Sequence, residues 1–75
     1  MEDQIYETDI LSKEEKNKMV KWHEEEIGTD WEVNEDPSGE PNKYYILFFD
    51  LTMEEVSMIK SWEVAIDHNR KAVRV

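Results

Sequence analysis

Apolar residues in the first half of the chain recur at the spacing of an amphipathic helix. The segment SKEE at residues 12–15 is a capping box, in which the Ser12 hydroxyl accepts from the Glu15 amide and the Glu15 carboxylate accepts from the Ser12 amide. The apolar stripe behind it comprises Met19, Val20, His23 and Ile27, with Trp22 at its border. Because Gly28 supplies a left-handed stop, the pattern predicts a helix over about residues 13–27.

Beyond Gly28 the pattern changes to the alternation of a strand. Trp31, Val33 and Glu35 alternate with Glu32 and Asn34, which predicts a half-buried strand over residues 31–35. The sequence DPSG at residues 36–39 places each residue where a type I turn prefers it. The segment KYYILFFDL then predicts a second strand over residues 43–51, so the two strands form a hairpin.

The strand at residues 43–51 is apolar on both of its faces. One face carries Tyr44, Ile46 and Phe48, and the other carries Tyr45, Leu47, Phe49 and Leu51. A strand of this kind belongs in the centre of a sheet. Two helices packed on one side would leave either Tyr44, Ile46 and Phe48 or Tyr45, Leu47 and Phe49 facing solvent. An exposed apolar patch is typical of an interface, unless the N-terminal segment or a loop covers it.

A second capping box, TMEE at residues 52–55, predicts the start of another helix. Leu51 and Val56 flank the box at the spacing of a hydrophobic staple. The apolar stripe that follows comprises Met58, Ile59, Trp62, Ala65 and Ile66. Asn69 can end this helix, which gives a range of about 53–68. Residues 4–8 and 71–75 alternate over short stretches and allow an edge strand at each end of the chain.

These elements predict a single α+β domain over residues 1–75. It has two layers, an antiparallel sheet around the central hairpin 31–35/43–51 and two helices at about 13–27 and 53–68. If both terminal strands form, the order is β-α-β-β-α-β, the ferredoxin-like arrangement. The chain has no cysteine, so no disulfide supports this fold.

The charge of the chain narrows the choice of partner. Nineteen Asp and Glu against nine Lys and Arg give a net charge of −10. This charge argues against direct binding to nucleic acid or to an anionic membrane. No apolar run approaches the ~20 residues of a membrane span, and the acidic first residues do not resemble a signal peptide. We therefore expect a cytoplasmic protein whose partner is a protein with a basic surface.

The acidic residues are concentrated between positions 24 and 40, where the chain has no Lys or Arg. They are Glu24, Glu25, Glu26, Asp30, Glu32, Glu35, Asp36 and Glu40. The first three lie near the predicted C-terminal end of a helix, where each exposed anion costs about 0.3–1 kcal/mol against the helix dipole. This placement against helix stability favours a partner-binding role, in which carboxylates mimic nucleic-acid phosphates in a basic groove. A solvated face kept for solubility explains the same residues.

Two segments have weak metal-site patterns. Residues 34–40 resemble the first half of an EF-hand loop, with ligand types at Asn34, Asp36, Ser38 and Glu40. The twelfth position is Tyr45 rather than a glutamate, so a hairpin loop is the preferred interpretation. His23 and His68 lie on different predicted helices without the spacing of a zinc motif, and a partly buried His23 is expected. We predict no metal and no cofactor.

The chain also lacks the motifs of an enzyme. It has no nucleophile elbow or dinucleotide fingerprint, and its two glycines cannot build a phosphate-binding loop. Paired carboxylates are too common here to indicate acid–base catalysis. We predict no catalytic residue and no enzymatic activity.

The sequence therefore favours a protein-binding module. The leading hypothesis is an inhibitor or regulator that covers a basic, nucleic-acid-binding surface of a target, as phage-type antagonists of host enzymes or defence systems do. The alternative is a structural module that dimerises or docks through its apolar sheet face. An immunity protein or antitoxin is a further alternative, and all these analogies rest on size and charge alone.

Overall fold

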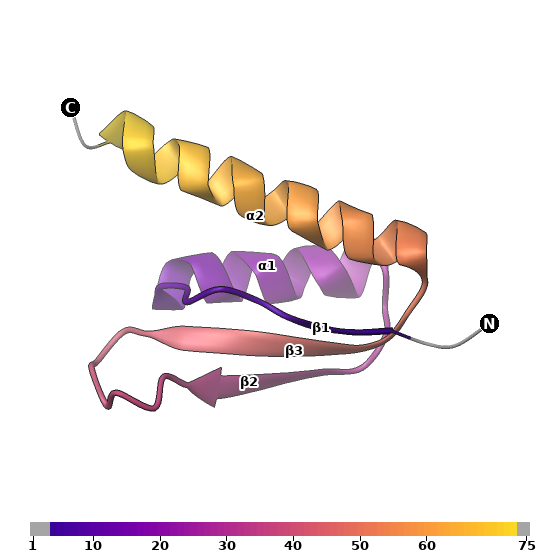
Figure 1. Cartoon of the computed structure of the whole chain (residues 1–75), viewed down its shortest axis with the longest axis horizontal. Helices are drawn as coiled ribbons and strands as arrows, with labels where there is room; N and C mark the ends of the chain where they lie inside the picture. Colours follow the sequence, from indigo (N-terminus) through magenta and orange to yellow (C-terminus); the bar gives the residue numbers. More distant parts are fainter. Residues whose placement is uncertain (1–3, 74–75) are drawn as a thin grey trace.

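The protein is a two-layer α+β domain in which both helices cover one side of a three-stranded sheet (Figure 1). The computed structural model describes residues 4–73, with side chains described for residues 4–70. In chain order the elements are β1 (Gln4–Glu7), α1 (Lys13–Glu26), β2 (Trp31–Glu35), β3 (Tyr44–Leu51) and α2 (Met53–Val73). The sheet is antiparallel with the order β1-β3-β2, so the predicted class and the central position of β3 are confirmed.

Both ends of α1 form as predicted. The Ser12 hydroxyl accepts from the Glu15 amide at 3.2 Å, and the Glu15 carboxylate accepts from the Ser12 amide at 2.9 Å. At the other end Gly28 has a φ of 82°, and its N–H donates to the carbonyl of His23 at 2.7 Å. These contacts satisfy backbone groups that have no partner inside the helix.

Helix α2 begins as predicted but ends later. Thr52 and Glu55 form the second capping box, with distances of 3.1 and 2.9 Å. The expected stop at Asn69 is wrong, because α2 continues to Val73. Asn69 does not take the left-handed conformation that a helix-ending Asn often adopts, since the non-glycine residues described with positive φ are Asn42 and Asp50. Residues 71–73 continue the helix instead of forming an edge strand, and residues 74–75 lie outside the described range. Over the described residues, neither helix is long and apolar enough to span a bilayer.

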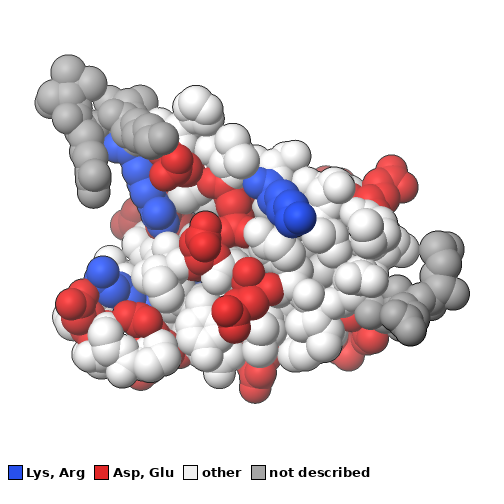
Figure 2. Space-filling view, viewed as in Figure 1, with Lys and Arg blue, Asp and Glu red and all other residues white. Residues whose placement is uncertain are grey.

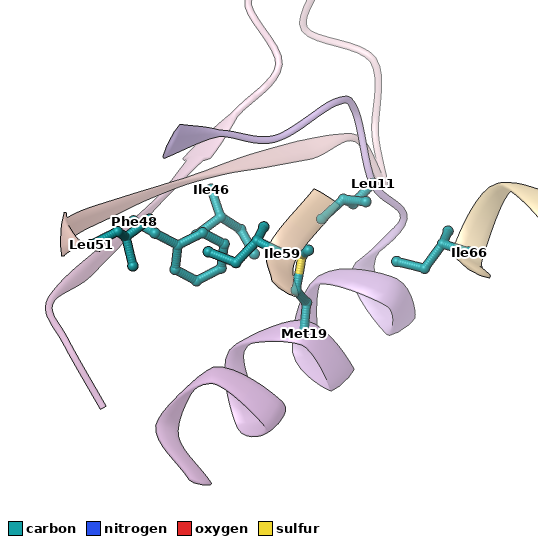
Figure 3. Close-up of a cluster of buried hydrophobic side chains, with 7 residues drawn as sticks. All are labelled: Leu11, Met19, Ile46, Phe48, Leu51, Ile59 and Ile66. Atoms are coloured by element: carbon teal, nitrogen blue, oxygen red, sulfur yellow. The ribbon is translucent and has the colours of Figure 1, made fainter. Parts of the chain in front are cut away.

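The core lies between the sheet and the two helices. Its buried apolar residues are Leu11, Met19, Ile46, Phe48, Leu51, Ile59 and Ile66 (Figure 3). Trp22 of α1 and Trp62 of α2 pack against this cluster, with ring centroids 5.7 Å apart, so the helices also contact each other directly. Ala65, which the sequence placed on the buried stripe of α2, is exposed.

A bulge in β3 changes which of its side chains enter the core. Gln4 lies opposite Leu51 and Tyr6 lies opposite Phe48, so β3 has one residue more than β1 between these pairs. Asp50 has a φ of 56°, the left-handed conformation that Asp tolerates better than most residues. The prediction that Leu51 shares a face with Phe49 is therefore wrong. The extra residue turns Leu51 into the core beside Phe48.

A salt bridge joins the second half of α2 to the start of α1. The Arg70 guanidinium donates to both carboxylate oxygens of Glu15, with Nε–Oε2 at 2.8 Å, and also donates to the carbonyl of Ile10 at 3.0 Å. These hydrogen bonds hold the pKa of Glu15 below its ordinary value. Arg70 thus fixes the position of α2 relative to the chain before α1.

We expect Arg70→Ala to lower the free energy of unfolding by about 1–2 kcal/mol, because the Arg70 side chain is 40% exposed and its ion pair is partly screened. Arg70→Lys should recover only part of the loss, since lysine cannot form the two-pronged contact. The Glu15 contribution is present above its ordinary pKa of 4.5 and disappears as pH falls through the lowered value. Urea unfolding of the parent protein and of Arg70→Ala at neutral and acidic pH would measure this contribution. A stability difference between the two proteins that grows on acidification would contradict the prediction.

Candidate interaction surface

The side of the sheet away from the helices carries an apolar row on β3. Because Ile46 and Phe48 are buried under the helices, their alternate neighbours face the other way. These neighbours, Tyr45, Leu47 and Phe49, are half-buried and form what we call the open-face row. Of the two sets that the sequence left open, Tyr44, Ile46 and Phe48 face the helices and the open-face row does not.

Acidic and polar residues of the neighbouring strands border this row. Leu47 lies directly opposite Glu7 of β1 on one side and Glu32 of β2 on the other. Residues directly opposite in a sheet share a face, so Leu47 lies between two carboxylates. Asn34 is in the same way opposite Tyr45. Ile5, which is 64% exposed, lies opposite the bulge at Phe49 and Asp50 and extends the apolar area.

The eight acidic residues of the predicted stretch do not form one patch. Glu24, Glu25 and Glu26 are exposed at the C-terminal end of α1, and Asp30 directly precedes β2. Glu32 and Glu35 lie in β2, and Asp36 and Glu40 lie in the loop that follows. At about 3.3 Å per residue, the six steps of extended chain from Asp30 to Asp36 span roughly 20 Å. Figure 2 likewise shows Asp and Glu spread across the visible face. Glu32 borders the open-face row, and Asp30 adjoins it through its carbonyl, which accepts from the Phe49 amide at 2.9 Å.

Oxygen atoms of Asp36 and Glu40 in the β2–β3 loop already have partners within or next to the loop. The Asp36 carbonyl accepts from the Gly39 amide at 3.0 Å, and the Asp36 carboxylate accepts from the Ser38 hydroxyl. Glu40 pairs with Lys43 at 3.1 Å. The predicted turn is thus present, and within residues 4–70 no three His, Cys, Asp or Glu side chains are grouped to hold a metal. The loop geometry therefore gives calcium binding no support.

His23 is fully buried, deeper than the sequence predicted. Its ring centroid lies 4.5 Å from that of Phe48, and its Nε2 lies 2.9 Å from the Thr29 hydroxyl. Its Nδ1 is buried without a hydrogen-bond partner. Burial disfavours the charged imidazolium and lowers the pKa of His23 below the ordinary 6.5, although Glu55 and Glu24 partly oppose the shift. The ring is therefore a neutral part of the core.

Stability should fall as the pH drops below about 6.5, since the unfolded chain then binds a proton at His23 that the folded chain resists. The slope approaches at most ~1.4 kcal/mol per pH unit and ends at the lowered pKa. Urea unfolding between neutral pH and pH ~5.5 would measure it. His23→Gln should flatten this slope, and His68→Gln on the exposed side of α2 is the matched control. Equal slopes in both variants would contradict this role of His23.

A second polar cluster holds β1 against α2. The Glu63 carboxylate accepts from the Tyr6 hydroxyl and, at 2.9 Å, from the amide of Asp9. Burial and this carboxylate raise the pKa of Tyr6 well above its ordinary value. Surface hollows of about 420 and 500 Å³ lie beside Arg70, one bordered by Glu63 and the other by Glu15. Both carboxylates already accept the hydrogen bonds described above, so their evident task is structural.

The sequence missed two residues of the open sheet face, Ile5 and Glu7. Residues 4–8 alternate as a short strand would, but so short an alternation does not reveal which neighbour the strand pairs with. Its register with β3 comes from residues about forty positions away. Any sequence signal for Glu7 would have required knowing that pairing.

Fold and surface together define a small α+β domain with one sheet face free of helices and an apolar row set between carboxylates. Comparison of the chain with protein-family models, with curated proteins and with solved structures finds no match.

Proposed function

We propose that the protein is a non-enzymatic binding module that covers a basic surface of a target protein with its open sheet face. It acts as an inhibitor or regulator by steric and electrostatic blockade. The observation that carries this proposal is the position of Leu47 between Glu7 and Glu32, within an apolar row. An apolar centre with a polar, solvent-accessible rim is the usual anatomy of a protein interface.

The two kinds of residue have different tasks in this proposal. The open-face row and Ile5 supply the apolar contact that holds the complex together. Glu7 and Glu32 select Lys and Arg on the target. The net charge of −10, to which the exposed Glu24, Glu25 and Glu26 contribute, accelerates the approach to a basic partner.

A nucleic-acid-binding surface is the basic target that suits this charge best, because it carries clustered Lys and Arg. Covering it would exclude the nucleic acid. Phage-encoded antagonists of host enzymes or defence systems are one class of small cytoplasmic protein that works in this way.

Salt-dependent binding tests the proposal. The tagged protein would capture its target from a cell extract at low salt, and the purified target would then be titrated at low and high salt. We expect the affinity to fall at least tenfold as the screening length shrinks from ~10 Å at 0.1 M to ~3 Å at 1 M. The complex should also exclude nucleic acid from the target. An affinity that does not change with salt would contradict the proposal.

The open-face row also supports a second candidate, a module that dimerises or docks through this face. Burying the row would stabilise a domain of this size. A symmetric dimer is disfavoured because it would bring Glu7 and Glu32 of both copies, all negatively charged, into one interface. Light scattering at increasing concentration distinguishes the two, and Phe49→Asp should dissociate a dimer. Phe48→Asp would not test dimerisation, because Phe48 is buried in the core and its replacement would unfold the protein.

A further inference from the structure

The outer edge of β2 presents unpaired backbone groups, and their positions follow from the β2–β3 register. The Phe49 amide donates to the Asp30 carbonyl at 2.9 Å, and the Asp36 amide donates to the Lys43 carbonyl at 3.0 Å. Bonded pairs alternate with non-bonded pairs in an antiparallel ladder. Residues 30, 32, 34 and 36 therefore bond to β3, and the N–H and C=O groups of Trp31, Val33 and Glu35 point away from it.

No other strand of the described chain reaches this edge. β2 is the last strand of the sheet on its side, and β3 occupies its inner edge. Edge strands usually avoid pairing by being short, bulged or covered. The register of β2 with β3 is unbroken over all five of its residues, whereas β1 at the opposite edge pairs across a bulge. β2 is thus the more regular edge for an added strand.

The side chains along β2 indicate what such a strand would carry. Asp30, Glu32, Glu35 and Asp36 give the segment four carboxylates and no Lys or Arg. A second copy of the chain would bring its own four to the same seam, and like charges across a strand pair are destabilising. By the same rule, an added strand that places Lys or Arg beside Glu32 would be stabilised by the opposite charges.

Trp31 adds a contact on the other face of the edge. It lies opposite Phe48 on the helix side of the sheet and is still 38% exposed. An apolar side chain of an added strand would pack against this exposed indole, and an arginine would stack on it. The edge therefore fits a segment that alternates basic and apolar residues.

We propose that the outer edge of β2 takes up an extended basic segment of the target as a fourth strand. This inference rests on the proposed function and names the part of the partner that is recognised. The outward groups of Trp31, Val33 and Glu35 would bond to the backbone of the segment, as in other complexes formed by strand addition. Its alternate basic side chains would face Glu32.

The acetylated and amidated peptide Lys-Val-Lys-Val-Lys-Val is a direct probe. Hydrogen exchange followed by NMR should show the amides of Trp31, Val33 and Glu35 slowed at least about tenfold by millimolar peptide. A peptide with Glu in place of Lys should give no protection. The same Lys-Val peptide with an N-methyl group on every residue keeps its charge but loses the N–H donors of both strand edges, and it too should give none.

A pair of variants tests the backbone contact from the protein side. Glu35→Pro removes an outward N–H and leaves the bonds to β3 intact, because proline is tolerated where the N–H of an edge strand faces solvent. Glu35→Ala removes the same charge and keeps the N–H. Both should match the unfolding midpoint of the parent protein, and the proline variant should bind the Lys-Val peptide at least about tenfold more weakly than the alanine variant.

Two results would overturn strand addition. One is unchanged exchange at Trp31, Val33 and Glu35 with millimolar peptide, and the other is equal binding of the N-methylated peptide. If the captured target still binds in a salt-dependent manner without protecting these amides, the proposed function stands and only the strand addition fails. If the peptide protects these amides but no salt-dependent target is captured, the proposed function fails, and only the capacity of the β2 edge to pair with a basic strand is retained.

Discussion

Replacing Phe48 with alanine should lower the free energy of unfolding by about 3–5 kcal/mol, whereas Phe49→Ala should cost about 1 kcal/mol or less. The two residues are adjacent and chemically identical. Phe48 is fully buried between His23 and the rest of the core, while Phe49 belongs to the open-face row. The first substitution leaves a cavity, and the second removes only partly covered surface.

The total stability expected for 75 residues is about 4–11 kcal/mol, so the Phe48→Ala protein should be largely unfolded at the lower end of that range. Urea unfolding followed by tryptophan fluorescence would measure both variants, because Trp22 and Trp62 pack against the core. Equal losses in the two variants would mean that β3 does not bury the face described here.

The double substitution Glu7→Lys and Glu32→Lys should weaken binding to the target about 100-fold, or ~2.7 kcal/mol. Both carboxylates lie opposite Leu47, so the change places two cations beside the apolar contact and against a basic surface. Like charges across an interface oppose binding directly. Titration of the purified target with each protein would measure the loss, and circular dichroism would show that the fold is kept.

The control is Glu24→Lys and Glu25→Lys, which alters the net charge by the same amount on the exposed end of α1. It should slow association and change affinity less than about tenfold, because the charge is reversed away from the contact. If the control loses as much affinity as the Glu7 and Glu32 variant, the end of α1 is the contact and the open sheet face is not. That outcome would favour the acidic residues between positions 24 and 40 as the partner-binding surface, which is the hypothesis that the sequence suggests.

Local signals predicted the element boundaries that local chemistry decides. The two capping boxes and Gly28 act within four residues, and the helix starts at Lys13 and Met53 and the end of α1 follow from them. The DPSG turn and the alternation around it likewise predicted the hairpin. These features depend on neighbours in the chain, which a sequence displays directly.

Features that depend on distant residues could not be predicted in this way. The bulge at Asp50 appears only when β1 pairs with β3, and it moves Leu51 to the face opposite the one that alternation implies. The partners of Glu15 and Glu63 are Arg70, Tyr6 and Asp9, and each lies more than fifty positions away in the chain.

The candidate site shows the same division. The sequence identified the two apolar faces of β3 but could not choose between them, because the choice depends on which face the helices cover. It also treated residues 24–40 as one acidic surface, although the extended chain from Asp30 to Asp36 alone spans roughly 20 Å. Glu7 completes the border of the open-face row from a segment that the acidic stretch does not include.

The strand order has a consequence for synthesis on the ribosome. β2 and β3 are neighbours in the chain and can close a hairpin soon after both emerge. Tyr6, in contrast, is made 42 residues before its partner Phe48, a delay of about 2–8 s at 5–20 residues per second. The core is complete only when α2 delivers Ile59 and Ile66. The nascent N-terminal segment therefore waits unpaired, and cooperative folding begins only after nearly the whole domain has been translated.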